Sequence, residues 1–215
     1  MSAVTIVWFR HDLRLDDNPA FLEATQRGRV LPVFIWAPEE EAPWEPGAAS
    51  RWWLHQSLES LSEKLQKLGC PLVIRRGPTL KTLQHLVKDI HATDVVWNRR
   101  YEPAVVKRDT VIKKTLAQDG LRAESFGGSL LYEPSRIATK QGNPYQVFTP
   151  FWRALLARDE SAEPIAAPRK VKPASTTVKS LSLKSLKLLP QPDWSGVMAK
   201  SWNPGEAGAK KLLNT

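Results

Sequence analysis

The 215-residue sequence contains a single cysteine, Cys70, so no internal disulfide can form and a reducing compartment is expected. It has no apolar run near the ~18 residues of a membrane-spanning helix, and no signal-peptide pattern precedes Val4. Its four histidines are scattered and lack the spacing of metal ligands. These shortages favour a cytoplasmic protein without a membrane partner or a zinc site, and we expect a monomer.

Glycine is also missing from the first predicted turn. The apolar run Thr5–Phe9 is followed by Arg10, Asp12 and Arg14, and a helix pattern opens at Asn18. Turns that bring the backbone close to a pyrophosphate group use glycines. This turn therefore argues against that mode of recognition and leaves any ligand contact to side chains.

Strand-like and helix-like patterns alternate over the first 126 residues. Apolar runs predict strands at Val4–Phe9, Val30–Trp36, Leu72–Arg75, Val95–Trp97 and Ala123–Phe126. Amphipathic spacing and capping residues predict helices at Pro19–Arg27, Ala49–Leu68, Thr79–His91 and Pro103–Gln118. The predicted fold class is therefore α/β, a five-stranded parallel Rossmann-like sheet in the order 3-2-1-4-5 with helices on both faces.

In such sheets, ligands bind beyond the carboxyl ends of the strands, where the winding direction reverses. For this strand order the point lies between the first and fourth strands, at the segments FRHDLRLDDN and WNRRYEP. Arg10 and Asp12 are candidate ligand contacts there, although opposite charges at this spacing also pair with each other. Asn98 either hydrogen-bonds a ligand or caps the turn. Trp36 either stacks on a ligand or packs in the core. Arg99 and Arg100 either lie at the rim of the site or, as we expect, are solvated surface.

The formal charge of +9 is concentrated near the end of the chain. Residues 165–215 hold nine Lys or Arg and two Asp or Glu, whereas residues 1–164 hold 22 and 20. A basic tail of this kind either contacts nucleic-acid phosphates or forms a poorly ordered linker. The composition leaves both interpretations open.

Five blocks of the sequence, taken in order, resemble the N-terminal domain of the photolyase/cryptochrome family. They are VWFRHDLRLDDNPAF, VFIWAPEEEAPWEPGAASRWWLHQSL, VVWNRRYEP, SLLYEP and NPYQVFTPFWRAL, and they span most of residues 4–158. The second block further resembles the cyclobutane-dimer photolyases that are close to plant-type cryptochromes. Residues 1–158 are thus predicted to be an α/β antenna-binding domain.

The resemblance implies an antenna chromophore, 5,10-methenyltetrahydrofolate or, as the alternative, a deazaflavin. In this family a helical C-terminal domain binds FAD and UV-damaged DNA, and light-driven electron transfer there splits the pyrimidine dimer. The implied activity of the whole protein is this carbon–carbon lyase reaction in DNA repair. The alternative is a cryptochrome blue-light photoreceptor without repair activity.

The sequence departs from the family pattern after residue 158. Residues 159–201 hold five prolines among Ser, Thr and Lys, which predicts an interdomain linker. In residues 202–215, Asn203 as the N-cap, Pro204 as the first helical residue and Glu206 as the third form a helix-start pattern, and no stop pattern follows. We expect this segment to be the truncated start of the FAD-binding helical domain, a partner in cis. We expect no catalytic residue in the chain itself.

Glu102 matches the position at which folate-binding members of the family hold the pterin with a carboxylate. A carboxylate has two acceptor oxygens, and a 2-amino-4-oxo pterin presents adjacent N–H donors. A deazaflavin offers one N–H between two carbonyls, so Glu102 favours a folate. The alternative is a glutamate that interacts with the dipole of the helix that follows.

Two aromatic segments carry the remaining predictions. On the helix predicted at 49–68, Trp52 lies roughly 160° from the leucine stripe and Trp53 about 100° from it. We expect Trp52 to be covered by the chromophore or by the EEEAPWEP loop, away from the Leu54 cluster. In the segment 143–158, Phe148, Phe151 and Trp152 are expected to pack against the rest of the protein, although Arg153 and Arg158 could face DNA.

Overall fold

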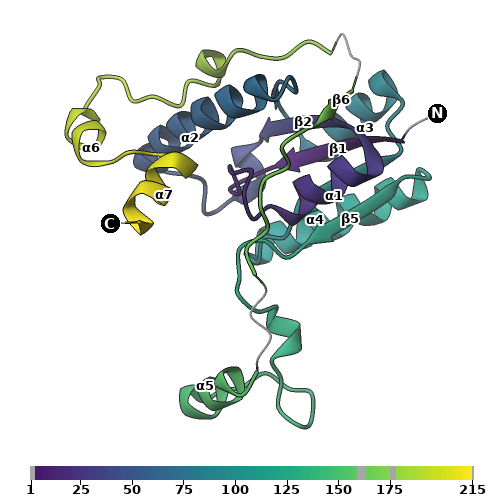
Figure 1. Ribbon diagram of the computed structural model, residues 1–215, viewed down its shortest axis with the longest axis vertical. Helices are drawn as coiled ribbons and strands as arrows, with labels where there is room; N and C mark the ends of the chain where they lie inside the picture. Colours follow the sequence, from purple (N-terminus) through teal and green to yellow (C-terminus); the bar gives the residue numbers. More distant parts are fainter. Residues whose placement is uncertain (1–2, 159–162, 175–177, 215) are drawn as a thin grey trace.

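The computed structural model describes residues 3–158, 163–174 and 178–214. At its centre lies a sheet with the strand order β3-β2-β1-β4-β5, in which every neighbouring pair is parallel (Figure 1). These strands are β1 (Ala3–Phe9), β2 (Gly28–Trp36), β3 (Val73–Arg76), β4 (Asp94–Asn98) and β5 (Arg122–Phe126). The predicted fold class and strand order are confirmed.

A sixth strand, β6 (Lys172–Pro173), corrects the prediction of five. It pairs in parallel with the start of β2, where Arg29 lies opposite Lys172. The backbone N–H of Ala174 extends the pairing by donating to the Val30 carbonyl at 2.8 Å. Two residues, one of them a proline, are too few to show the alternation that identifies a strand in a sequence.

Four helices cover the sheet, and their bounds agree with the prediction to within one residue. They are α1 (Pro19–Arg27), α2 (Ala48–Lys67), α3 (Thr79–Ile90) and α4 (Pro103–Gln118). Asn18 caps α1 as predicted, because its side-chain oxygen accepts from the Phe21 N–H at 3.0 Å. Gly28 ends α1 where a Cβ would lie 2.5 Å from the Ala3 carbonyl oxygen, so the approach of helix end and strand requires glycine there.

The alternation of side chains along β1 and β2 divides the core between the two faces of the sheet. Val7 and Phe9 belong to the cluster that includes α1 and α2 side chains such as Phe21 and Leu58. Ile6 belongs to the other cluster, which includes side chains from α3 and α4. Both faces of the sheet are therefore covered by helices, as expected of a doubly wound parallel sheet.

The chain after residue 163 packs on this domain over much of its described length. Leu186 and Leu188 are buried in the α1–α2 cluster, next to the short 3₁₀ helix η3 (Leu183–Leu186). The Leu181 N–H donates to the Ile74 carbonyl at 3.0 Å. Residues 178–189 therefore pack on the domain and are not a poorly ordered linker.

Two short helices, α6 (Gly196–Ser201) and α7 (Glu206–Leu213), follow and lie beside α2 (Figure 1). α7 begins at Glu206 with Gly205 as its N-cap, so the predicted N-cap at Asn203 is wrong. Gly205 has φ of 93°, which a side chain rarely adopts, and a Cβ there would lie 2.7 Å from Ser60 Oγ of α2. The close approach to α2 therefore sets where this helix starts.

The segment after β5 extends away from the sheet and ends in α5 (Phe148–Leu156) (Figure 1). This helix has no buried residue. Phe148 and Trp152 stack on each other with centroids 6.1 Å apart, and 70% and 44% of their surfaces are exposed. The prediction that they pack against the rest of the protein is wrong for this chain. No described helix is long and apolar enough to cross a bilayer.

Candidate functional site

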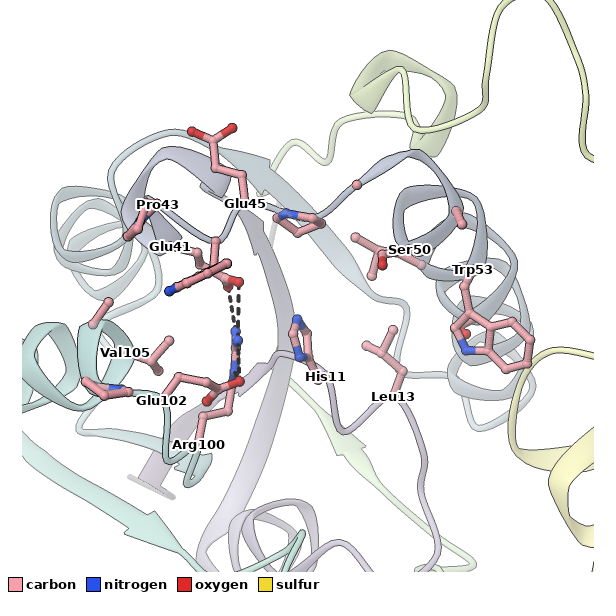
Figure 2. A pocket seen from close by; sticks show the side chains of 18 of the residues that line it. His11, Leu13, Glu41, Pro43, Glu45, Ser50, Trp53, Arg100, Glu102 and Val105 are labelled. Atoms are coloured by element: carbon pink, nitrogen blue, oxygen red, sulfur yellow. Dashed lines mark hydrogen bonds and ion pairs between the residues drawn. The ribbon is translucent and has the colours of Figure 1, made fainter.

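A cavity of about 1120 Å³ opens at the carboxyl-terminal edge of the sheet (Figure 2). The turn after β1, the loop after β2, the first turns of α2 and the start of α4 surround it. This volume lies slightly above the ~300–1,000 Å³ typical of small-molecule sites. Apolar side chains on its walls include Leu13, Pro43, Trp44, Pro46, Trp53, Leu54, Val105 and Met198. Its polar side chains include His11, Glu41, Glu45, Ser50, Arg100 and Glu102.

Arg100 links two carboxylates on different walls of this cavity (Figure 2). Its Nη1 donates to Glu41 Oε1 at 2.5 Å, and its Nη2 donates to Glu102 Oε1 at 2.8 Å. The Arg100 side chain is only 11% exposed, so the prediction of a solvated surface residue is wrong. The sequence pattern did not show that the loop after β2 folds back to supply a carboxylate.

Glu41 is held in place by the 3₁₀ helix η1 (Pro38–Glu41). The neighbouring Glu40 anchors η1 to α3, because its carboxylate accepts from the Thr79 N–H at 2.7 Å and from Thr79 Oγ1 at 2.5 Å. The acidic loop is thereby fixed at one end, and Arg100 holds it toward the β4–α4 turn.

Glu102 lies at the start of α4, with 54% of its side chain exposed. Burial alone would raise the pKa of this carboxyl, but hydrogen bonding and the charge of Arg100 outweigh it and lower the pKa to about 2. Glu102 is therefore ionised at neutral and mildly acidic pH. Its carboxylate keeps an acceptor oxygen, Oε2, that Arg100 does not use.

His11 lies on the wall between Arg100 and α2 (Figure 2). The surrounding protein lowers its pKa below the ordinary 6.5, first by desolvation and then through the positive charge of Arg100, although Glu41 and Glu102 oppose the shift. The imidazole is therefore neutral at neutral pH and can both donate and accept one hydrogen bond.

Two tryptophans from different elements face the same cavity. Trp44 lies on the loop after β2 and is 84% exposed, and Trp53 lies on α2 and is 39% exposed. Large aromatic rings with so much open surface are suited to stacking on a planar heteroaromatic ring. Aromatic walls combined with an ionised carboxylate fit a flat molecule that has hydrogen-bond donors along one edge.

The predicted switch point between β1 and β4 is filled by a polar network. Asn98 is buried, and its amide nitrogen donates to Asp12 Oδ2 at 2.6 Å and to Asn18 Oδ1 at 2.7 Å. Its side-chain oxygen accepts from the Ala20 N–H at 3.1 Å. Asp12 also accepts from the Arg10 N–H at 2.8 Å. Asn98 and Asp12 do not line the cavity, and these contacts connect the β1 turn to β4 and to the start of α1.

Arg10 and Trp36 lie behind the cavity, beside a small hollow of about 30 Å³. The buried Arg10 guanidinium pairs with Asp109 and donates to the Asn98 carbonyl. Arg10 and Arg108 both lie over the Trp8 ring, 4.8 and 5.0 Å from its centroid. Trp36 belongs to the α1–α2 core cluster. A ligand role for Arg10 and Trp36 stays a prediction, and the space beside them holds about one water.

Trp52 is buried, with 3% of its surface exposed, and it belongs to neither core cluster. Trp52 is therefore covered and lies apart from the Leu54 cluster, as expected, and its cover by the EEEAPWEP loop or by a chromophore stays a prediction. Its ring lies 6.3 Å from that of Trp53, which in turn contacts Trp202 at 5.8 Å. Of the two neighbouring tryptophans, Trp53 is the one that lines the cavity, and a ligand role for Trp52 stays a prediction.

The comparison with protein families matches residues 5–170 to the model described as DNA photolyase. A deoxyribodipyrimidine photo-lyase from Agrobacterium fabrum is 46% identical over 99% of this chain, and Cryptochrome-2 from Arabidopsis thaliana is 37% identical over all of this chain. This chain spans only 44% and 36% of the lengths of those relatives. A crystal structure of a class III photolyase from Agrobacterium tumefaciens superposes with a TM-score of 0.93 at 45% identity, covering all of this chain and 44% of that one.

Proposed function

This chain belongs to the DNA photolyase family, and we propose that it is the light-harvesting antenna domain of a deoxyribodipyrimidine photo-lyase. The observation that supports this proposal best is the cavity, in which Trp44, Trp53 and the ionised Glu102 lie at one edge of the sheet. Family membership implies a flavin and an antenna chromophore. Our proposal places the antenna chromophore in this cavity rather than at the switch point near Asn98.

The proposed chromophore is 5,10-methenyltetrahydrofolate, with a deazaflavin as the alternative. Trp53 and Trp44 would hold the planar ring system by stacking, and Glu102 Oε2 would accept hydrogen bonds from adjacent donors on the pterin edge. When bound, the chromophore supplies light absorption, and the residues of this chain only bind and orient it. The apolar walls would exclude water from the ring.

Replacing Glu102 by glutamine is expected to weaken folate binding by about 1–3 kcal/mol, because an amide donor would replace an acceptor oxygen opposite the donors of the pterin. Titration of 5,10-methenyltetrahydrofolate into wild type and variant, followed by absorbance, measures the effect. Glu63→Gln, an exposed site on the same chain, is the matched control and should bind like wild type. Equal affinities for all three proteins would remove Glu102 from the site.

We propose that residues 1–158 form the antenna domain, that residues 159–201 connect it to the next domain, and that residues 202–215 begin a helical domain that binds FAD and UV-damaged DNA. Support comes from the relatives, which are more than twice as long as this chain. The exposed aromatic face of α5 at Phe148 and Trp152 also suits a partner in cis. The cytoplasm and a monomeric state remain part of this proposal.

The 215-residue chain alone is expected neither to bind FAD stoichiometrically nor to repair dimers, because the proposal places both functions outside it. A flavin absorbance spectrum after reconstitution, and a light-dependent repair assay on UV-irradiated oligonucleotides, check this. The Agrobacterium photo-lyase relative serves as the positive control. A flavin spectrum together with repair by this chain would contradict the proposal that FAD binding and repair lie in another domain.

A cryptochrome photoreceptor is the second candidate, because Cryptochrome-2 from Arabidopsis thaliana matches the whole chain at 37% identity. The higher identity to the photo-lyase favours the repair enzyme. A light-dependent repair assay on the full-length protein that we propose, with this chain joined to its own FAD-binding domain, separates the two. Repair above the dark control supports the photo-lyase, and flavin photoreduction without repair supports the photoreceptor.

A further inference from the structure

Glu206 joins three parts of the chain that are far apart in sequence. Its carboxylate accepts from the Leu15 N–H at 3.2 Å and from the Asp16 N–H at 3.1 Å, both in the turn after β1. It also accepts from Lys64 Nζ of α2 at 2.7 Å. The Glu206 side chain is only 8% exposed. A carboxylate that takes two backbone donors and an ammonium group at one point holds all three elements in place.

These elements are the ones that form one side of the cavity. The turn after β1 carries His11 and Leu13, which line it, and α2 carries Trp53 (Figure 2). The C-terminal segment, residues 195–213, contributes Met198 to the cavity wall and packs the Trp202 ring edge-on against Trp53, with an interplanar angle of 80°.

Further contacts fix the same segment on the domain. Lys210 pairs with Asp16, next to the Glu206 carboxylate. Gly205 approaches Ser60 of α2 closely, as described above. The segment is therefore seated in one position, and Glu206 is its buried ionic contact with both the turn and α2.

We propose that Glu206 is a positioning residue for the cavity. It keeps the turn after β1, helix α2 and the C-terminal segment at the spacing that lets Leu13, Trp53 and Met198 form one wall. This inference rests on the proposed function, because its consequence is a change in ligand affinity. Glu206 itself does not line the cavity and acts through the elements that it joins.

The test compares Glu206→Gln with wild type in a titration with 5,10-methenyltetrahydrofolate, well below the unfolding temperature of both proteins. Glutamine keeps the size but brings an amide donor toward backbone donors, so the dissociation constant is expected to rise roughly tenfold. Hydrogen exchange should quicken in residues 195–213 and also in residues 10–16, the turn after β1 that carries His11 and Leu13. Glu63→Gln is the control on α2 and should change neither measurement.

Unchanged affinity in Glu206→Gln, with faster exchange limited to residues 195–213, would overturn the proposal and leave Glu206 as a contact of the C-terminal segment alone. If wild type does not bind the folate, the proposed function fails. The role of Glu206 is then tested by hydrogen exchange alone. Faster exchange of residues 10–16 in Glu206→Gln than in wild type supports the positioning role, and unchanged exchange there overturns it. If Glu206→Gln does not fold, Lys64→Met removes one arm of the contact and should raise the dissociation constant by a smaller factor, roughly threefold.

Discussion

Replacing Trp53 by alanine is expected to weaken binding of 5,10-methenyltetrahydrofolate roughly 5- to 150-fold, because stacking of a heteroaromatic ring on an indole contributes ~1–3 kcal/mol. The loss should be large because Trp53 also contacts Trp202, so its removal opens the wall toward the C-terminal segment. Tryptophan fluorescence quenching in wild type, and chromophore absorbance in both proteins, give the two affinities.

Two controls keep this result specific to the site. Trp53→Phe retains a smaller ring and should lose only part of the affinity. Trp194→Ala removes an indole that is 47% exposed and does not line the cavity, and it should bind like wild type. If Trp53→Ala also binds like wild type while remaining folded, the chromophore does not occupy this cavity.

Replacing Asn98 by alanine is expected to lower the free energy of unfolding by about 2–4 kcal/mol without changing the affinity of the folded protein for the folate. The change removes three hydrogen bonds, and it leaves the Ala20 N–H and the Asn18 side-chain oxygen without the bonds that Asn98 makes. Buried polar groups that lose their partners account for most of this cost. Urea denaturation and the folate titration measure the two quantities.

Asn143→Ala is the matched control, because Asn143 is exposed and should change stability by less than about 0.5 kcal/mol. If Asn98→Ala instead left stability unchanged and weakened folate binding, the proposed site would be contradicted. The chromophore would then bind at the switch point between β1 and β4.

The sheet and its four covering helices could be predicted because their evidence is local. Leu58 and Leu61 repeat at helical spacing, and Asn18 and Gly28 mark the two ends of α1. The strand β6 and the start of α7 could not be predicted in the same way. Both are set by contacts with β2 and α2, more than 100 residues away in the sequence.

The candidate site likewise combines residues that the sequence predicted with residues that only the fold brings together. Glu102 came from the match to the family's folate-binding position, whereas the general rule for α/β sheets pointed to Asn98, whose hydrogen bonds lie within the fold. The helix bounds that placed Trp52 away from the leucine stripe are correct to one residue, but they did not show that Trp53 lines the cavity. Met198 comes from a remote segment of the sequence, so nothing near α2 in the sequence could show that it joins the cavity wall.

The central claim is that the chromophore binds in the cavity between the loop after β2 and helix α2. A crystal structure of this chain with 5,10-methenyltetrahydrofolate tests it most directly. The account predicts density for the ring system against Trp53, with its donor edge on the Glu102 carboxylate and the Arg10–Asn98 network unchanged. Density for the folate beside Asn98 and Asp12, with the cavity at Trp53 holding only water, would contradict it.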